Sequence, residues 1–150
     1  MPQHPFAYNN LAFIYNMHGY HKEAAIVCQT AKVRFPKEVN HNCYRHWAYA
    51  LFKENNKSGK AFKKINKAVK EDPLDAESWI LWGMMLRSVG NYEQAVHKIK
   101  IALDLDPENK TAIYENELLK EMVHVDSQLE LSQGPYLRLM KAKETGERGY

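Results

Sequence analysis

Seven histidines and two cysteines are the residues of this chain that could hold a metal or move protons. The tightest group is His41, Cys43 and His46, but a helix that begins before His41 would not turn all three side chains to one face. His18 and His21 lie in a turn region, and no further cluster completes a set of four ligands. The sequence therefore predicts no metal site and no cofactor.

Motifs of enzyme chemistry are missing from the sequence. It contains no phosphate loop, no glycine-rich dinucleotide turn, no nucleophile elbow and no zinc-binding helix motif. The carboxylates fall mostly at expected hairpin ends and on solvent faces, where no neighbour prepares them for acid–base catalysis. We therefore expect a protein that is not an enzyme and has no small-molecule substrate.

A lysine-rich segment is the strongest local concentration of charge. It contains Lys60, Lys63, Lys64, Lys67 and Lys70, whereas the net charge of the whole chain is only +3. The favoured interpretation is a solvated helix face. The alternative is a basic patch that contacts RNA or an acidic partner, and this remains a minor hypothesis because the segment has no arginine and no series of interleaved aromatic residues.

The elements that must position these residues follow from an internal repeat. Pro36, Pro73 and Pro107 each lie five residues after one alanine and twelve after another. The alanine pairs are Ala24 and Ala31, Ala61 and Ala68, and Ala95 and Ala102. Prolines spaced by 37 and then 34 residues predict helical hairpins stacked in a row, each burying the apolar face of its neighbour.

Each repeated residue type has a physical reason. Alanines two turns apart on one helix face allow two helix axes to approach closely. Gly19 and Gly90 can adopt the left-handed backbone of a tight reversal, and each proline follows a helix that it prevents from continuing. Asp75 and Asp106 stand near the next helix starts, where a carboxylate could cap free amides.

These residues resemble the tetratricopeptide repeat (TPR) over about residues 5–109. The third copy has Trp79, Trp82, Gly83, Leu86, Gly90, Ala95, Ile99, Ala102 and Pro107. The first has Tyr8, Leu11, Ala12, Tyr15, Gly19, Ala24, Cys28, Ala31 and Pro36. The second has Tyr44, Trp47, Ala48, Leu51, Ala61, Ile65, Ala68 and Pro73, with one extra residue in the turn at 55–59. Three copies in register make the resemblance specific.

The resemblance implies an all-α fold, a right-handed superhelical solenoid of antiparallel helical hairpins. After a lead at 1–4, the repeats would span 5–38, 39–75 and 76–109, and a capping helix would span 110–125. That helix would pack Ile113, Tyr114, Leu118, Leu119, Met122 and Val123 on the third repeat and turn Glu115, Glu117, Lys120 and Glu121 to water. Residues 126–150 are expected to be partly disordered, with an apolar stretch that packs back or docks on a partner.

The resemblance also places the functional surface. In this family the first helix of each hairpin lines a concave groove, and Phe13, Tyr49 and Met84 would form an apolar stripe across it. The other predicted groove residues are Asn9, Asn10, Arg45, His46, Ile80 and Leu81. We expect an adaptor or scaffold that binds a partner helix or extended peptide in this groove.

One known variant of such a groove does not fit. Some members bind the acidic tails of heat-shock chaperones through a clamp of three cations and two asparagines. Its positions hold Phe6 and Asn10, then His46, then Glu77 and Leu81, so only Asn10 agrees. Because a terminal carboxylate needs charge-assisted hydrogen bonds, the sequence predicts no chaperone-tail binding by this route.

A second function class remains open. The chain could be a structural subunit of a larger assembly, with Phe6 and Tyr8 on its N-terminal edge and its C-terminal tail as contacts. No apolar run predicts a membrane span, no signal peptide is visible, and two cysteines are too few for a disulfide framework. These features predict an intracellular, cytoplasmic location.

Overall fold

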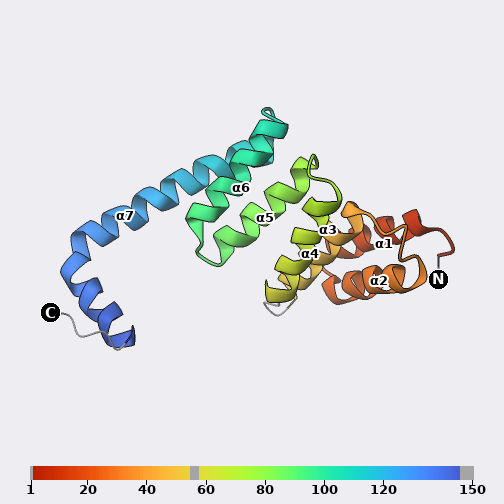
Figure 1. Ribbon diagram of the computed structural model, residues 1–150, viewed down its shortest axis with the longest axis horizontal. Helices are drawn as coiled ribbons and strands as arrows, with labels where there is room; N and C mark the ends of the chain where they lie inside the picture. Colours follow the sequence, from red (N-terminus) through yellow and green to blue (C-terminus); the bar gives the residue numbers. More distant parts are fainter. Residues whose placement is uncertain (1, 55–57, 146–150) are drawn as a thin grey trace.

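Seven helices make up the part of the chain that the computed structural model describes, residues 2–54 and 58–145. They are α1 (Pro5–Met17), α2 (His21–Arg34), α3 (His41–Lys53), α4 (Ser58–Glu71), α5 (Ala76–Ser88), α6 (Tyr92–Leu105) and α7 (Lys110–Thr145). Successive helices pair as antiparallel hairpins that follow one another along the molecule (Figure 1). The predicted all-α solenoid of three hairpins and a further helix is confirmed.

The helices form two layers. Helices α1, α3, α5 and α7 contact one another in succession and form the inner layer, while α2, α4 and α6 each pack against inner helices. The outer helices make no close backbone contact with each other, so the outer surface is open between them. This spacing leaves parts of the inner helices exposed between their outer neighbours.

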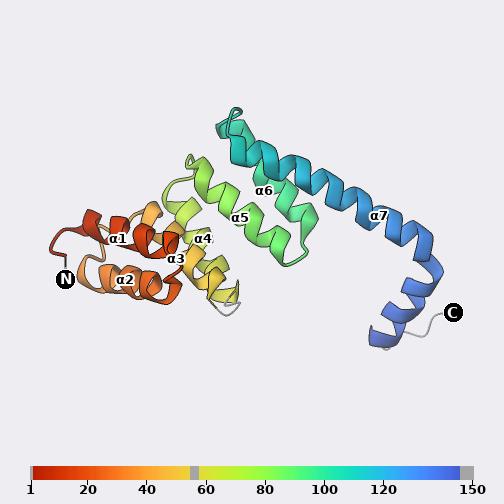
Figure 2. The same ribbon diagram turned by 180° about the vertical axis from the view of Figure 1, so that it is seen from behind.

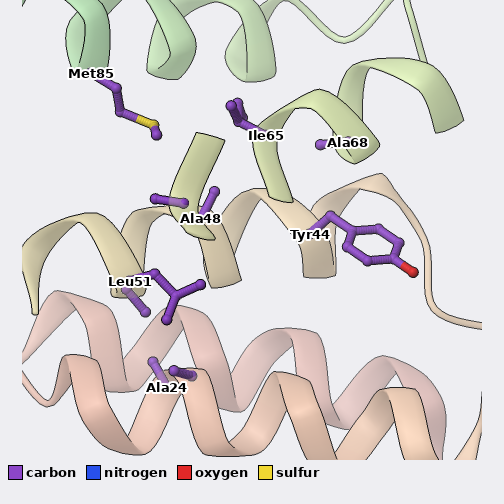
Figure 3. Close-up of a cluster of buried hydrophobic side chains, with 10 residues drawn as sticks. Ala24, Tyr44, Ala48, Leu51, Ile65, Ala68 and Met85 are labelled. Carbon is purple, nitrogen blue, oxygen red and sulfur yellow. The ribbon is translucent and has the colours of Figure 1, made fainter. Parts of the chain in front are cut away.

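The alanine pairs lie where the layers meet. All six alanines of the repeat pattern are buried, with at most 2% of their surface exposed. Figure 3 shows how Ala24 of α2, Leu51 of α3, Ile65 of α4 and Met85 of α5 join one apolar cluster. Small side chains at these positions bring the helix axes together, and larger neighbours fill the remaining space.

Gly83 marks the closest approach of the two layers. A Cβ atom added there would lie 2.6 Å from Cδ1 and 2.7 Å from Cγ1 of Ile99, which is itself fully buried. The equivalent positions in the first two hairpins carry Ala12 and Ala48, so only the third hairpin has no side chain at this position. The hairpin turns also follow the prediction, because Gly19 and Gly90 both have φ of 82°.

The capping prediction for Asp75 is wrong. Asp75 occupies the N-cap position of α5, but its side chain accepts no hydrogen bond from a backbone amide there. Its carboxylate instead accepts hydrogen bonds from the Ser78 hydroxyl and the Arg45 guanidinium. Asp106 ends α6, and Asn109 rather than Asp106 caps α7 through the amide of Ala112. Asparagine, not aspartate, supplies this cap.

The predicted end of the last helix at residue 125 is also wrong. Helix α7 continues through Gly134 and Pro135 to Thr145, extends beyond α6 and bends towards its C-terminal end (Figure 2). Proline removes one amide donor but has a helical φ, so it can kink a helix without ending it. Residues 126–145 of the segment that was expected to be partly disordered are therefore helical, and residues 146–150 lie outside the described part.

The face of α7 that packs on α5 and α6 agrees with the predicted one only in part. Leu119 is buried as predicted and Ala112 is also buried, whereas Ile113 and Tyr114, which were expected to pack, are 44% and 65% exposed. Glu115, expected in water, is 2% exposed. Its two carboxylate oxygens accept hydrogen bonds of 2.7 and 3.1 Å from Nε and Nη2 of Arg87 on α5. This bidentate ion pair makes burial of the carboxylate possible.

Candidate functional site

A hollow of about 290 Å³ crosses the inner layer and is the candidate partner site. We call it the inner groove. Its lining residues are Phe13, Asn16 and Met17 from α1, Arg45, His46 and Tyr49 from α3, Glu77, Ile80, Leu81 and Met84 from α5, and Thr111 from α7. The groove therefore draws on the first helix of each hairpin, as the resemblance implied, and also on α7.

Seven of the nine predicted groove residues line this hollow. They are Phe13, Arg45, His46, Tyr49, Ile80, Leu81 and Met84. The predicted apolar stripe of Phe13, Tyr49 and Met84 thus shares one surface. Because Ile80 is only 2% exposed and Phe13 is 48% exposed, the floor is packed and the rim is open.

Asn9 and Asn10 do not line the groove. The side-chain amide of Asn9 donates a 3.2 Å hydrogen bond to Oδ1 of Asn40, the N-cap residue of α3. Asn10 is exposed one helix turn before Phe13. These two residues are assigned to the edge of the first hairpin rather than to the inner groove.

Sequence reasoning missed the buried amide at one end of the groove. Asn16 is 8% exposed, and its Nδ2 donates a 3.0 Å hydrogen bond to the carbonyl of His46. Its Oδ1 lies 3.0 Å from Nδ1 of His21. Asn16 thereby ties α1 to α3 and to α2. No local pattern identifies this role, since both partners come from other helices.

Thr111 also lines the groove and was not predicted, but the repeat interval could have identified it. It lies 34 residues after Glu77, the same interval that separates the second and third prolines. The repeat register therefore continues into α7, and α7 occupies the place of a fourth inner helix. Tyr114 lies 34 residues after Ile80 and is exposed, because no further hairpin packs on α7 within the described ranges.

The positive charge of Arg45 is largely neutralised. Its guanidinium forms an ion pair with Asp75, and only 20% and 15% of the two side chains are exposed. His41 adds to this group, with Nε2 at 3.6 Å from Asp72 and 4.0 Å from Asp75. Arg45 is thus held at the groove wall by the next hairpin and is poorly placed to bind a second anion.

His46 contributes no charge at neutral pH. Its pKa is lowered from 6.5 to about 4, mainly by burial and also by the neighbouring Arg45, while Asp75 opposes the shift. Its ring centroid lies 5.6 Å from that of Phe13. The neutral imidazole therefore belongs to the apolar wall of the groove.

Glu77 is the acidic residue of the groove lining. It is exposed, and its Oε1 accepts a 3.1 Å hydrogen bond from the side-chain amide of Asn109. With Arg45 paired and His46 neutral, the carboxylate of Glu77 gives the groove a slightly negative character. An anionic ligand would gain little here, whereas an apolar segment with a nearby cation would fit.

The lysine patch lies on the outer layer, on α4. Lys67 is paired with Glu71 within the helix at 3.1 Å, and Lys64 lies 3.8 Å from the ring centroid of Trp47. The aromatic partner comes from α3, so the surface has an aromatic neighbour that the lysine segment does not itself supply. The lysine segment itself has no interleaved aromatic series, and its aromatic neighbour in the fold is Trp47.

The candidate metal residues separate in the fold. His41 faces Asp72 and Asp75, Cys43 is buried, and His46 lies in the inner groove. Within residues 2–54 and 58–145, no three His, Cys, Asp or Glu side chains are placed to hold a metal. The thiol of Cys28 donates to the carbonyl of Cys43 at 3.6 Å, and a hydrogen bond with Cys43 together with burial raises the pKa of Cys28.

The helices of the described part were also compared with the length and hydropathy of membrane spans. None of them is both long and apolar enough to cross a membrane.

Comparison with known proteins identifies the fold. The sequence matches no family model, and no curated protein sequence matches it. The first TPR domain of human RPAP3 superimposes with a TM-score of 0.74 at 18% identity, covering 83% of this chain and 95% of that domain. The Arabidopsis OM64 TPR domain gives a TM-score of 0.70 at 21% identity, and the match covers 79% of this chain and 95% of that domain.

A third similar structure contains a ligand. The second TPR domain of human RPAP3, in complex with the HSP70 peptide SGPTIEEVD, gives a TM-score of 0.66 at 19% identity, covering 78% of this chain and 98% of that domain. The chain thus has the TPR fold, and the predicted resemblance is confirmed. TPR domains are protein–protein interaction modules that bind peptides and are typically non-catalytic.

Proposed function

We propose that this protein is a non-catalytic adaptor or scaffold that holds a helix or an extended segment of another protein in the inner groove. The observation that carries the proposal is the shared apolar surface of Phe13, Tyr49 and Met84, contributed by three successive inner helices. Aromatic and methionine side chains on a concave surface are frequent anchors of peptide binding. The rigid alanine-packed layers beneath them supply a preformed shape.

The charges of the groove support a partner of low negative charge. Arg45 is paired with Asp75, His46 is neutral, and Glu77 is exposed at the rim. Binding would therefore depend on apolar contact and on shape. A basic side chain of the partner near Glu77 would add specificity.

The experiment compares affinity capture from cell lysate by the wild type and by Tyr49→Glu/Met84→Glu. A matched control, Val33→Glu/Leu74→Glu, introduces the same charge at apolar residues that are 76% and 75% exposed outside the groove. We expect a discrete set of proteins to be lost only with the groove variant, at unchanged helix content. If both variants still captured the same proteins, the inner groove would not be the binding site.

The chaperone-tail peptide bound by a structural neighbour provides a second test. We infer that this chain does not bind the HSP70 peptide SGPTIEEVD by a carboxylate clamp, because Glu77 would repel its terminal carboxylate. The variant Phe6→Lys/His46→Asn/Glu77→Lys/Leu81→Arg restores the clamp residue types. Peptide binding by this variant and not by the wild type is expected, and binding by the wild type would contradict the inference.

The alternative function, a structural subunit of a larger assembly, is favoured by the exposed apolar side chains of α7. Val125, Leu129 and Leu131 are 53%, 48% and 79% exposed. Phe6 at the N-terminal edge is 62% exposed, whereas Tyr8 is fully buried and cannot serve as an edge contact. Concentration-dependent self-association that is lost in Leu129→Lys/Leu131→Lys would support this function, and a monomer at all concentrations would argue against it.

A further inference from the structure

A second hollow, of about 410 Å³, lies between α2, α3 and α4 and shares no lining residue with the inner groove. We call it the outer hollow. It is lined by Lys22, Ala25, Ile26 and Gln29 of α2, Trp47 and Leu51 of α3, Glu54, and Lys60, Lys63 and Lys64 of α4. Because α2 and α4 make no close backbone contact, α3 forms the floor between them.

The outer hollow combines an apolar floor with a basic rim. Trp47 and Leu51 form the floor, and Ile26 is 51% exposed beside them. Four lysines surround these side chains, and Glu54 is the one acidic residue among the described lining residues. A surface of this kind fits a ligand that carries apolar and negatively charged groups together.

The positive charge of this face is not balanced locally. Helix α4 carries five lysines and one glutamate, and α2 adds two lysines and Arg34 against Glu23. Their combined positive charge exceeds the +3 of the whole chain, so the remaining residues are net negative. Burial lowers the pKa of Lys64, and the neighbouring Lys32 and Lys63 lower it further, which shows that like charges are crowded here.

We propose that the outer hollow binds an acidic amphipathic segment of a partner protein, with an apolar side chain against Ile26 at the edge of the Trp47–Leu51 floor and carboxylates against the lysines. The site is separate from the inner groove and does not depend on its function. The lysines supply point charges suited to flexible carboxylates.

Protein rather than single-stranded RNA is favoured by the placement of the tryptophan. RNA bases are held by stacking on open aromatic faces. The ammonium of Lys64 lies 3.8 Å from the ring centroid of Trp47, so it occupies one face of the ring. In addition, α4 contains no arginine, which would stack on bases or bind phosphate in a bidentate manner.

The test measures the binding of three fluorescein-labelled probes at two salt concentrations. The first is a short peptide of alternating Glu and Asp around a central pair of leucines, which we call the leucine peptide. The second has serines in place of the leucines, and the third is an oligouridylate of equal charge. We expect the leucine peptide to bind most tightly. Ile26→Ser should weaken its binding about fivefold through lost apolar contact. Val33→Ser, two turns further along the same face of α2 and not among the residues that line the hollow, should not change it.

Charge variants complete the test. Lys60→Glu/Lys63→Glu should weaken binding of the leucine peptide about tenfold or more. The control Lys37→Glu/Lys110→Glu changes the net charge by the same amount at exposed sites elsewhere, and it should weaken binding much less. The groove variant Tyr49→Glu/Met84→Glu should still bind the peptide. The proposal would be overturned if both charge variants lost the same affinity for the leucine peptide. It would also be overturned if the oligouridylate bound most tightly or if Ile26→Ser left the affinity unchanged.

Discussion

The inner and outer layers of this solenoid both place cations beside apolar side chains, but they differ in how these cations are held. On the inner helices, Arg45 is paired with Asp75 and Arg87 with Glu115, and the carboxylates are 15% and 3% exposed. On the outer helices, Lys64 and Lys98 lie 3.8 and 4.0 Å from the ring centroids of Trp47 and Trp82. The inner ion pairs join successive hairpins, whereas the outer lysines keep their net charge at the surface.

This difference assigns separate roles to the two layers. A buried carboxylate that loses its partner is strongly destabilising, so the inner arginines are needed for folding. A lysine over an aromatic ring contributes little to stability when it remains near water. The outer charge is therefore available for binding, and the low-charge inner groove is left to apolar recognition.

Arg87→Met should have the largest effect. It leaves the carboxylate of Glu115 buried without its guanidinium, and we expect a loss of about 3–5 kcal/mol in the free energy of unfolding by urea. The double variant Arg87→Met/Glu115→Met removes both charges and should recover most of that loss. A single variant within about 1 kcal/mol of the wild type would show that the ion pair does not hold α7 to α5.

Acid should destabilise the inner layer through His46. Its pKa falls from 6.5 to about 4 on folding, so the unfolded chain binds a proton first as the pH decreases. Stability should fall by up to about 3 kcal/mol between about pH 6.5 and 4 and then level off for this group. His46→Gln should flatten this part of the stability curve relative to the wild type, and exposed His97→Gln should leave it unchanged. Parallel curves for His46→Gln and the wild type would contradict the assignment.

Gly83→Ala tests the contact between the two layers. The new methyl group would meet buried Ile99, and we expect a loss of about 1–3 kcal/mol in thermal or urea unfolding. Gly134→Ala is the matched control, because a Cβ added at Gly134 meets nothing within 4 Å. That control should be neutral or gain up to about 1 kcal/mol from helix propensity. If Gly83→Ala and Gly134→Ala changed the free energy of unfolding by the same amount, Gly83 would not be a close contact between the two layers.

Lys98→Met should have the smallest effect. The lysine stacks on Trp82 near water, so replacing it should change the free energy of unfolding by less than about 1 kcal/mol. Lys100→Met, on an exposed position of the same helix, provides the control. If Lys98→Met lost as much free energy of unfolding as Arg87→Met, the outer lysines would stabilise the fold as strongly as the inner ion pairs, which would contradict the comparison.

The repeat pattern predicted the parts of the fold that depend on local sequence. Alanine spacing, glycine turns and proline stops each act within one hairpin, so the hairpins and the apolar stripe of Phe13, Tyr49 and Met84 could be placed from the sequence. The same register, continued by one interval, would have placed Thr111 at the end of the inner groove.

The errors concern contacts between distant residues. Glu115 was expected in water because the charge pattern of α7 cannot reveal Arg87, which lies 28 residues earlier. Asp75 does not cap its own helix because Arg45 and Ser78 engage its carboxylate. The end of α7 was placed at residue 125, but neither the polar residues 126–134 nor Pro135 ends the helix, because proline can remain in a kinked helix.

The inner groove is the central claim, and site-directed photo-crosslinking tests it most directly. A photoreactive benzoylphenylalanine would be placed at Met84 in the groove and, as a control, at Val33 on the exposed side of α2, and the crosslinked partners from lysate would be mapped by mass spectrometry. The account predicts a discrete partner segment, apolar in sequence, crosslinked at Met84 and absent at Val33. Crosslinking at Val33 with none at Met84 would contradict it.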